Sequence, residues 1–411
     1  MRRTVVSIAA LTAMLTATSA HASGWRIPEQ SLDSISKASA NIASASHPDA
    51  AYYNPANMGW LEDGWQIEGA FTYLHLTATD YEDDRTPLYN GSSAKEHFGL
   101  PVLFVVSPKY NNCRFGFALT APYGLSKRWP DPYPSNFAKD FTLKVFEANP
   151  TISYTFGDKV AISGGLRLLY GDAEVENAGV VDPTTGTYAL RNINGDSLAW
   201  GYNLAVAVKP SPDWNISATY RSQVDQDFDG DARLFTNLGP TDIHTDGSVT
   251  VPAPAVLSLS VAYTWEDLTV DLTWDRTYWG KYEGLDFDYT TPISNPLLYM
   301  LYDAPVVKDW QDASAYRLGL EYRVSDRFTL LGGFAYDETP APDEHLSFEL
   351  PDADAYLYSL GFRYRVNERL ELGVGALYDS KTARRVCNTN ACGEFTNAAA
   401  LLLTFGATYT F

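Results

Sequence analysis

The stretch YLYSLGFRYRV, residues 356–366, places Tyr356, Tyr358, Leu360, Phe362, Tyr364 and Val366 on one face and Ser359, Gly361, Arg363 and Arg365 on the other. Such a period of two is typical of a β-strand whose two faces meet different surroundings. Residues 316–324, 268–275 and 214–221 repeat the pattern. A soluble β-sandwich would alternate in the same way, but aromatic side chains at the ends of the apolar faces are typical of membrane barrels.

Alternation continues from residue 65 to the last residue and predicts fourteen strands. Short polar turns alternate with long loops, such as 175–195, 229–248 and 283–309. An even strand number with turns at one end and loops at the other is how outer-membrane barrels are built. We therefore expect an all-β transmembrane protein, a 14-stranded antiparallel outer-membrane barrel over residues 64–411. The predicted strands are 65–79, 96–107, 113–121, 140–156, 159–174, 196–209, 214–228, 249–264, 267–282, 310–324, 327–338, 353–366, 369–380 and 397–411.

The first 63 residues do not alternate. Residues 1–22 combine two arginines, a short apolar run and an Ala-His-Ala end, which predicts a secretory signal peptide. Residues 23–63 are rich in Ser and Ala, carry scattered apolar side chains, and reach an Asn54-Pro55 turn. A flexible linker has little use for those apolar residues, so we expect this segment to be packed inside the barrel in short helical pieces.

Composition excludes several classes of protein. The formal net charge of −20 disfavours nucleic acid as a partner, because phosphate binding needs a basic face. No later window is apolar enough for a transmembrane helix. The sequence contains no phosphate-binding glycine loop, metal-binding His-Glu-x-x-His or nucleophile elbow, and its histidines show no partnering pattern. We expect no enzyme activity, no cofactor and no metal site, although acidic loops could hold divalent cations with surface lipopolysaccharide.

Three cysteines in an exported chain allow one disulfide. Cys387 and Cys392 are close neighbours and form the natural pair, in an outer loop. Cys113 lies at the opposite end of the strand pattern, so it is predicted to stay reduced.

Two predicted strands are irregular. Ala121-Pro122-Tyr123-Gly124 brings Pro and Gly into or against a strand, which either ends there or is interrupted. The apolar positions slip by one between residues 143 and 148, which indicates a bulge in that strand.

With these features assembled, the chain resembles the FadL-type outer-membrane channels for long-chain fatty acids and other hydrophobic compounds. The resemblance spans essentially all of the chain after residue 22. It rests on the order and spacing of the following motifs: Ser23-Gly24-Trp25, Asn54-Pro55-Ala56, Pro122-Tyr123-Gly124-Leu125, Val251-Pro252-Ala253-Pro254-Ala255, Trp310-Gln311-Asp312, Tyr316-Arg317-Leu318-Gly319 and Leu350-Pro351-Asp352-Ala353-Asp354.

The resemblance implies that residues 23–63 form a hatch that plugs the lumen. It also implies passive uptake of a hydrophobic ligand, captured at outer loops and released sideways through a kinked strand. Ala121, Pro122 and Gly124 match the kink, and Asn54, Pro55 and Ala56 match the hatch turn expected beside it. Trp25 matches a position that reaches the ligand pocket.

Fatty-acid carriers of this family place basic residues in the lumen, and this chain departs from that pattern. Asn177 and Gln311 occupy two of the positions where basic residues are expected, while Arg167 and Arg317, with Lys308 and Arg363, are substitutes. Two ligand classes stay open, long-chain fatty acids and neutral aliphatic or aromatic hydrocarbons. A structural or adhesive surface barrel is the alternative from another class. Expected partners are the hydrophobic ligand, outer-membrane lipid and lipopolysaccharide, with the protein as a monomer.

Overall fold

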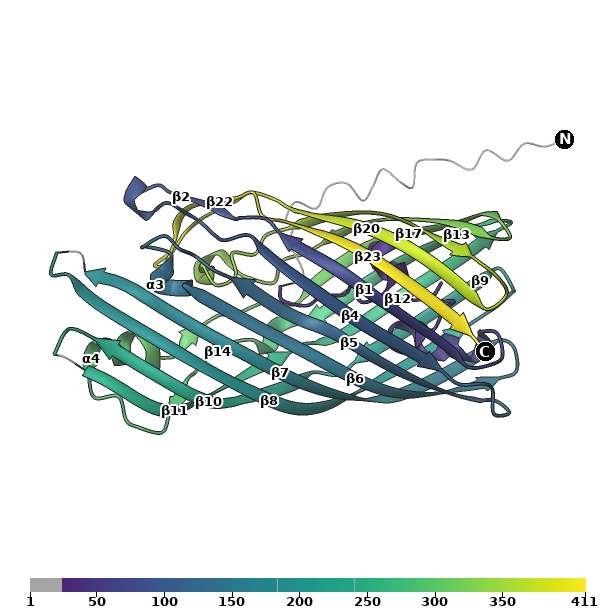
Figure 1. Cartoon of the computed structure of the whole chain (residues 1–411), viewed down its shortest axis with the longest axis horizontal. Helices are drawn as coiled ribbons and strands as arrows, with labels where there is room; N and C mark the ends of the chain where they lie inside the picture. The colour runs from purple at the N-terminus through teal and green to yellow at the C-terminus, as the bar shows by residue number, and fades with distance from the viewer. Residues whose placement is uncertain (1–23, 183, 240) are drawn as a thin grey trace.

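The computed structural model describes residues 24–182, 184–239 and 241–411. The expected signal peptide, residues 1–22, lies outside the described residues. Fourteen antiparallel strands form a closed barrel, because the last strand pairs with the first as well as with its predecessor (Figure 1). In ring order these strands are β1 (Gln66–Leu76), β4 (Glu96–Val106), β5 (Cys113–Lys127), β6 (Asp140–Phe156), β7 (Val160–Asp182), β8 (Thr187–Val208), β9 (Trp214–Arg221), β12 (Ala255–Trp265), β13 (Leu268–Tyr278), β17 (Ala313–Ser325), β18 (Phe328–Asp337), β19 (Ala355–Arg365), β20 (Leu370–Lys381) and β23 (Ala399–Thr410).

The strand prediction is confirmed, but two of the predicted loops are wrong. Residues 175–182 with 187–195, and 229–236 with 241–248, form β-hairpins instead, in which β7 pairs with β8 and β10 (Val224–Thr236) with β11 (Thr241–Ala253). Apolar and polar positions alternate in the second hairpin too, since Asp231 and Arg233 are exposed while Ala232 and Leu234 are buried. Polar outward positions are expected where strands rise out of lipid into water.

Most of the barrel wall is apolar outside and polar inside. Phe71, Leu198 and Trp200 are more than half exposed on the outer face. Arg167, Arg317 and Arg363 are buried on the inner face and paired with carboxylates. Lipid can accept the first set, and a closed ring of strands leaves no unpaired sheet edge facing it.

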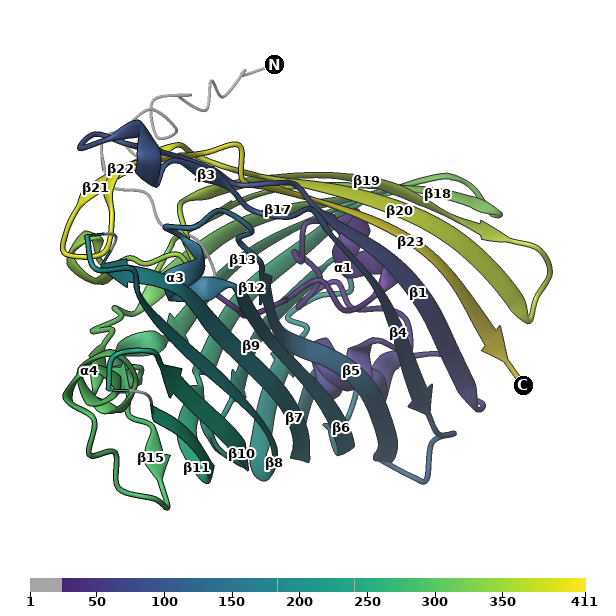
Figure 2. The same cartoon turned by 60° about the vertical axis from the view of Figure 1, so that its left-hand side comes forward.

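Residues 24–63, here called the N-terminal segment, run inside the ring of strands in Figure 2. They hydrogen-bond to inward-facing side chains of the wall. Arg363 of β19 donates to Asp33 at 2.6 Å, and Ser260 of β12 accepts from the backbone N–H of Ala43 at 3.0 Å. Hydrogen bonds from strands far apart in the ring place the segment on the inner side of the wall. Its short helices are α1 (Leu32–Ser36), α2 (Ala50–Tyr53) and the 3-10 helix η2 (Pro55–Trp60).

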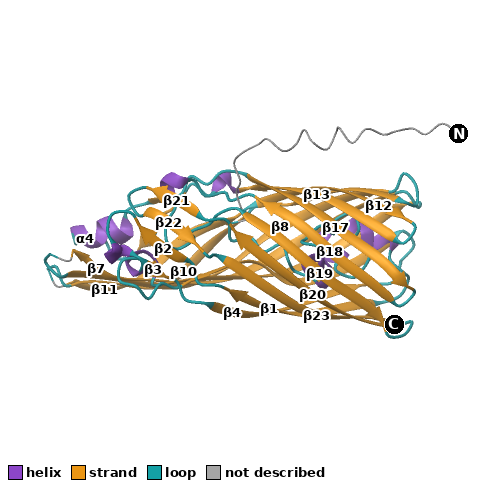
Figure 3. Cartoon of the chain, turned by 90° about the horizontal axis from the view of Figure 1, so that it is seen from above, coloured by secondary structure: helices purple, strands orange, loops and turns teal. Residues whose placement is uncertain are grey.

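The long loops fold over one end of the barrel, whereas the other end carries short turns (Figure 3). A small four-stranded sheet there contains β2 and β22 and carries the disulfide between Cys387 and Cys392, as predicted. Phe348 packs against the rings of Tyr81, Trp129 and Phe395 beneath it. The elements of the loops are β2 (Asp80–Asp83), β3 (Gly91–Ser92), β14 (Gly284–Leu285), β15 (Asp288–Tyr289), β16 (Val306–Val307), β21 (Arg384–Cys387), β22 (Cys392–Thr396), α3 (Ser135–Ala138), α4 (Pro296–Leu298), η3 (Pro87–Tyr89), η4 (Trp279–Lys281), η5 (Tyr299–Asp303) and η6 (Asp343–His345).

Among the described helices, none has the length and apolar content needed to cross a membrane.

Candidate functional site

The barrel wall is interrupted between β4 and β5. These strands pair from Val106–Gly116 to Leu103–Leu119 and no further, although both continue for several residues toward the loop end. We call this unpaired stretch, residues 96–102 of β4 and 120–127 of β5, the window.

The window arises because β5 bends at Pro122. The register of β5 on β6 shifts between Thr120 and Tyr123, so that two residues of β5 face one of β6. The strand therefore continues through Pro122 rather than ending there. The bulge predicted in residues 143–148 of β6 is on the wrong strand, because the extra residue belongs to β5 and only displaces its partners on β6.

The N-terminal segment bonds to the bent part of β5. The side-chain amide of Gln30 accepts from the Ala121 N–H at 2.7 Å and donates to the Ala121 carbonyl at 3.0 Å. The N–H of Ile27 donates to the Pro122 carbonyl at 2.8 Å, and the N–H of Gly124 donates to the Trp25 carbonyl at 3.0 Å. These contacts replace hydrogen bonds that β4 would have supplied in a continuous sheet.

The window is closed at its loop end. Arg128 donates through Nε to Oε1 of Glu96 at 2.8 Å, and the N–H of Ala94 donates to the Arg128 carbonyl at 2.7 Å. The window is thus bounded toward the turn end of the barrel by the Leu103–Leu119 pair, and toward the loop end by the contacts of Arg128.

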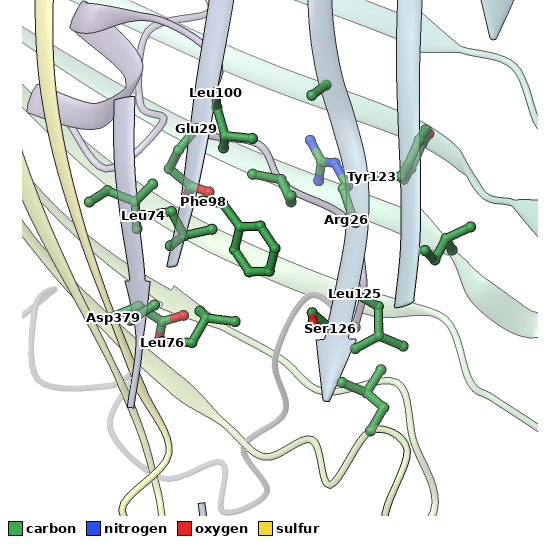
Figure 4. A pocket seen from close by; sticks show the side chains of 18 of the residues that line it. Arg26, Glu29, Leu74, Leu76, Phe98, Leu100, Tyr123, Leu125, Ser126 and Asp379 are labelled. Carbon is green, nitrogen blue, oxygen red and sulfur yellow. The ribbon is translucent and has the colours of Figure 1, made fainter. Parts of the chain in front are cut away.

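A cavity of about 390 Å³ adjoins the window (Figure 4). Its walls include inward-facing Leu74, Leu357 and Leu402 together with the outward-facing Lys144 and Phe146 of β6. Figure 4 shows the ring of Phe98 in the middle, with Leu100 and Glu29 on one side and Tyr123 and Leu125 on the other. The cavity therefore reaches from the lumen to the outer side of the wall.

A second cavity of about 60 Å³ lies toward the loop end. Leu125, Leu143 and Leu350 line both cavities, so these leucines separate the two. Trp25 lines the second cavity, with its ring 5.1 Å from that of Trp279 and 5.3 Å from that of Tyr123.

Of the residues predicted to meet the ligand, Trp25 and the substitute Lys308 line the second cavity, where Lys308 pairs with Glu349, and the others line neither cavity. Arg167 is buried and donates to Glu147 at 2.9 Å and to the Tyr123 hydroxyl at 3.2 Å. Arg317 pairs with Asp337 at 2.8 Å and Asp275 at 3.1 Å. Asn177 donates to the Phe137 carbonyl and accepts from Arg191, while Gln311 is exposed. The structure does not bring these five residues together.

Asn54, Pro55 and Ala56 lie away from the kink, against another part of the wall. The Asn54 amide donates to the Ile42 carbonyl at 2.9 Å and to Ser217 of β9 at 3.0 Å, and the Ala56 carbonyl accepts from Ser153 of β6 at 3.3 Å. The expected contact between Asn54 and the freed groups of β5 is wrong, because Gln30, Ile27 and Trp25 make those hydrogen bonds.

Sequence reasoning missed Gln30, Phe98 and Lys127. The side chains of Phe98 and Lys127 line the larger cavity, and Gln30 holds Ala121. Phe98 sits in an ordinary strand pattern and Lys127 follows the predicted strand 113–121, so their sequence positions carried no signal. Gln30 stands beside Glu29 in a stretch that also carries Arg26 and Asp33, so its sequence position carried no signal either.

Within the described ranges, no group of three or more His, Cys, Asp or Glu side chains is placed to hold a metal ion. Cys113 is a free thiol, partly buried, at the turn end of β5, far along the chain from the disulfide pair.

Comparisons with known proteins agree with this architecture. A long-chain fatty acid transport protein of Escherichia coli O6:H1 is 25% identical over 391 residues, which cover 85% of this chain and 84% of the relative. A FadL homologue of Pseudomonas aeruginosa has a TM-score of 0.84 at 17% identity, covering 95% of this chain and 100% of that one. The toluene transporter TbuX of Ralstonia pickettii has a TM-score of 0.69 at 16% identity, covering 92% and 99%.

The family model of outer membrane protein transport proteins, OMPP1/FadL/TodX, matches residues 13–411. The chain belongs to this family of outer-membrane transport proteins.

Proposed function

We propose that this protein is a passive channel that takes a hydrophobic compound from outside the cell and releases it sideways into the outer membrane through the window. The observation that carries the proposal is the cavity lined by Leu74 and Leu402 from the lumen and by Phe146 from the outer side of the wall. An apolar ligand in that cavity has a path to lipid that avoids water.

The energetics favour a lateral exit. Each buried methylene is worth roughly 0.8 kcal/mol, so a sixteen-carbon chain would lose roughly 10 kcal/mol on release into water. Release between β4 and β5 keeps that burial. An opening in the wall would otherwise leave strand N–H and C=O groups unpaired in lipid, which is costly. Gln30 and Ile27 satisfy several of those groups from the inside.

The N-terminal segment serves as a hatch in this proposal. Asp33 of the segment is fixed to the wall by the buried Arg363 of β19, which also pairs with Glu68 of β1. Its first residues, 24–30, border the cavity and touch β5. We therefore assign closure of the lumen to the whole segment and control of the window to residues 24–30. No chemical step is needed for such passage, so we assign the chain no catalytic role.

The route for entry runs through the second cavity. Ligand captured by the loops would reach Trp25 and then pass Leu125, Leu143 and Leu350 into the larger cavity. Long-chain fatty acids and neutral hydrocarbons both fit apolar walls of this kind.

The test narrows the window without touching the rest of the barrel. Leu100→Trp adds an indole at the cavity wall, while Leu103→Trp places the same side chain on the lipid-facing side just below the window. In vesicles with equal amounts of barrel, we expect Leu100→Trp to lower uptake of a labelled fatty acid or alkane about tenfold, since an indole fills much of such a gap. Leu103→Trp should transport at the parental rate.

Equal uptake by both variants would contradict lateral release. Planar-bilayer recording separates an aqueous porin, which would show a large stable conductance, from the plugged channel proposed here. Growth on a long-chain fatty acid or hydrocarbon as sole carbon source, compared between parent and deletion strain, separates a transporter from an adhesive barrel.

A further inference from the structure

The larger cavity contains a buried lysine whose charge is not neutralised by the protein. Lys127 is 9% exposed and donates to the Thr79 hydroxyl at 3.0 Å. Among the described residues it forms no ion pair. Glu96, near the same end of β4, pairs with Arg128 instead.

The other basic residues that line this cavity are already paired. Arg26 contacts Asp275 at 3.4 Å, Lys144 contacts Asp172 at 3.7 Å and Lys381 contacts Asp352 at 2.7 Å. A buried ammonium without a counter-ion is costly, and a bound anion would offset that cost. Lys127 therefore stands apart from every other cation of the cavity.

The Thr79 hydroxyl completes a binding site at Lys127. The Thr79 oxygen accepts from Lys127 and keeps its own proton for donation, and Thr79 is held in place because its N–H donates to Ser93 at 2.9 Å. An ammonium with a hydroxyl hydrogen-bonded to it suits a single carboxylate with two oxygens.

Carboxylates line another part of the same cavity. Glu29 and Asp379 both contribute to its wall, and one oxygen of Asp379 is buried without a hydrogen bond to any described group. An anionic head group is repelled there and attracted to Lys127. The apolar side chains Phe98, Leu125 and Leu143 line the walls for a chain.

We propose that Lys127, with the hydroxyl of Thr79, binds the carboxylate of an alkyl-chain acid and orients it so that the tail enters the window first. This inference rests on the proposed function and adds the ligand's head group and direction. Lys127 precedes Arg128, which is half exposed at the loop end of the window. A head group held there stays near the membrane surface while the tail passes into lipid, as an amphiphile does in a bilayer.

Equilibrium binding of dodecanoate, dodecanol and dodecyl phosphate to the barrel in lipid nanodiscs tests the proposal. Lys127→Met should weaken dodecanoate binding about tenfold or more, because it removes a hydrogen bond to a charged group. Dodecanol should bind within about twofold of the parent, since its neutral head gains little from an ammonium. Lys127→Arg should restore most dodecanoate affinity, and Thr79→Val should lower it less than Lys127→Met does.

Lys139→Met is the matched control, an exposed lysine that lines neither cavity and pairs with Glu176 at 2.8 Å. It should leave dodecanoate binding unchanged. Lys127→Met that binds dodecanoate like the parent, or that loses dodecanoate and dodecanol equally, would overturn the proposal. Tighter binding of dodecyl phosphate than of dodecanoate would overturn the carboxylate and indicate a phosphate head group. A parent that binds none of the three contradicts the proposed function itself, independently of Lys127.

Discussion

The two edges of β4 differ sharply. Toward β1 the ladder is continuous, from Gln66–Val106 to Leu76–Glu96. Toward β5 it stops at Leu103–Leu119. The same strand is therefore sealed on one side and open on the other, and the opening comes from the bend in β5 rather than from any weakness in β4.

The comparison shows how a membrane barrel can tolerate an incomplete wall. Unpaired backbone groups are costly in lipid. At the open edge the N-terminal segment supplies partners from within, chiefly the side chain of Gln30 and the backbone of residues 25–27. The sealed edge needs no such help. We expect the open edge, and not the sealed one, to respond to changes in these residues.

Straightening β5 should have the largest effect. Pro122→Val together with Gly124→Ala restores an N–H and favours an extended strand, so the window should close and uptake should fall about tenfold. The Cβ added at residue 124 would lie 3.1 Å from the flexible end of Ile27, which can yield. Uptake by vesicles at equal barrel abundance is the measurement.

The control for this pair is Gly69→Ala on the sealed edge, where the added Cβ meets nothing closer than 3.9 Å. It should transport normally. A parental rate in the doubly substituted barrel would mean that the bend is not part of the route.

Removing the Gln30 amide should loosen the open edge. Gln30→Leu leaves the N–H and carbonyl of Ala121 without side-chain partners. Leaving these two backbone groups of Ala121 unpaired should destabilise the contact between the N-terminal segment and β5 by about 2 kcal/mol. Amide exchange in that part of β5 should then be roughly thirtyfold faster. Hydrogen exchange should accelerate in residues 121–124 and remain slow in β1. Equal acceleration at both edges would show general unfolding instead.

Asn54→Ala should have a smaller and different effect. It removes the donor to Ile42 and Ser217, at a cost to stability of about 1 kcal/mol. Ligand release per folded barrel should stay the same. A loss of release with normal stability would restore Asn54 as the gating residue and count against Gln30.

The smallest change is expected at the loop end of the window. Arg128 is 49% exposed where it pairs with Glu96, and exposed ion pairs contribute less than about 1 kcal/mol. Arg128→Gln should alter release less than about twofold, because the backbone bond from Ala94 to residue 128 remains. A large increase in uptake would show that this ion pair, rather than Gln30, holds the window closed.

The sequence predicted the barrel well because each strand face meets a uniform environment. Tyr358 and Phe362 face outward and Arg363 faces inward, as their alternation indicates. The same logic failed at residues 229–236, where Asp229, Asp231 and Arg233 replace lipid-facing residues above the membrane and the strand resembled a loop. Cys387 and Cys392 were predicted from proximity in sequence, and their disulfide is present.

The site was harder to predict because it depends on contacts between distant residues. Local chemistry at Pro122 and Gly124 marked an irregularity, and the family resemblance identified it as a kink. Which part of the N-terminal segment meets that bend depends on how the segment lies in the lumen, and the Asn54 turn gave a plausible but wrong answer. The uncompensated charge of Lys127 appears only once every neighbouring carboxylate has been matched with its partner.

Photo-crosslinking during uptake tests lateral release most directly. The photoreactive residue p-benzoylphenylalanine would replace Phe146, on the outer side of the window, Phe71, on the outer face of β1 at the sealed edge, or Trp60, beside the turn end of the lumen. After a brief pulse of radiolabelled fatty acid, the account predicts strong labelling at residue 146 and background labelling at residues 71 and 60. Labelling at residue 60 with none above background at residue 146 would contradict it, since the ligand would then leave through the lumen.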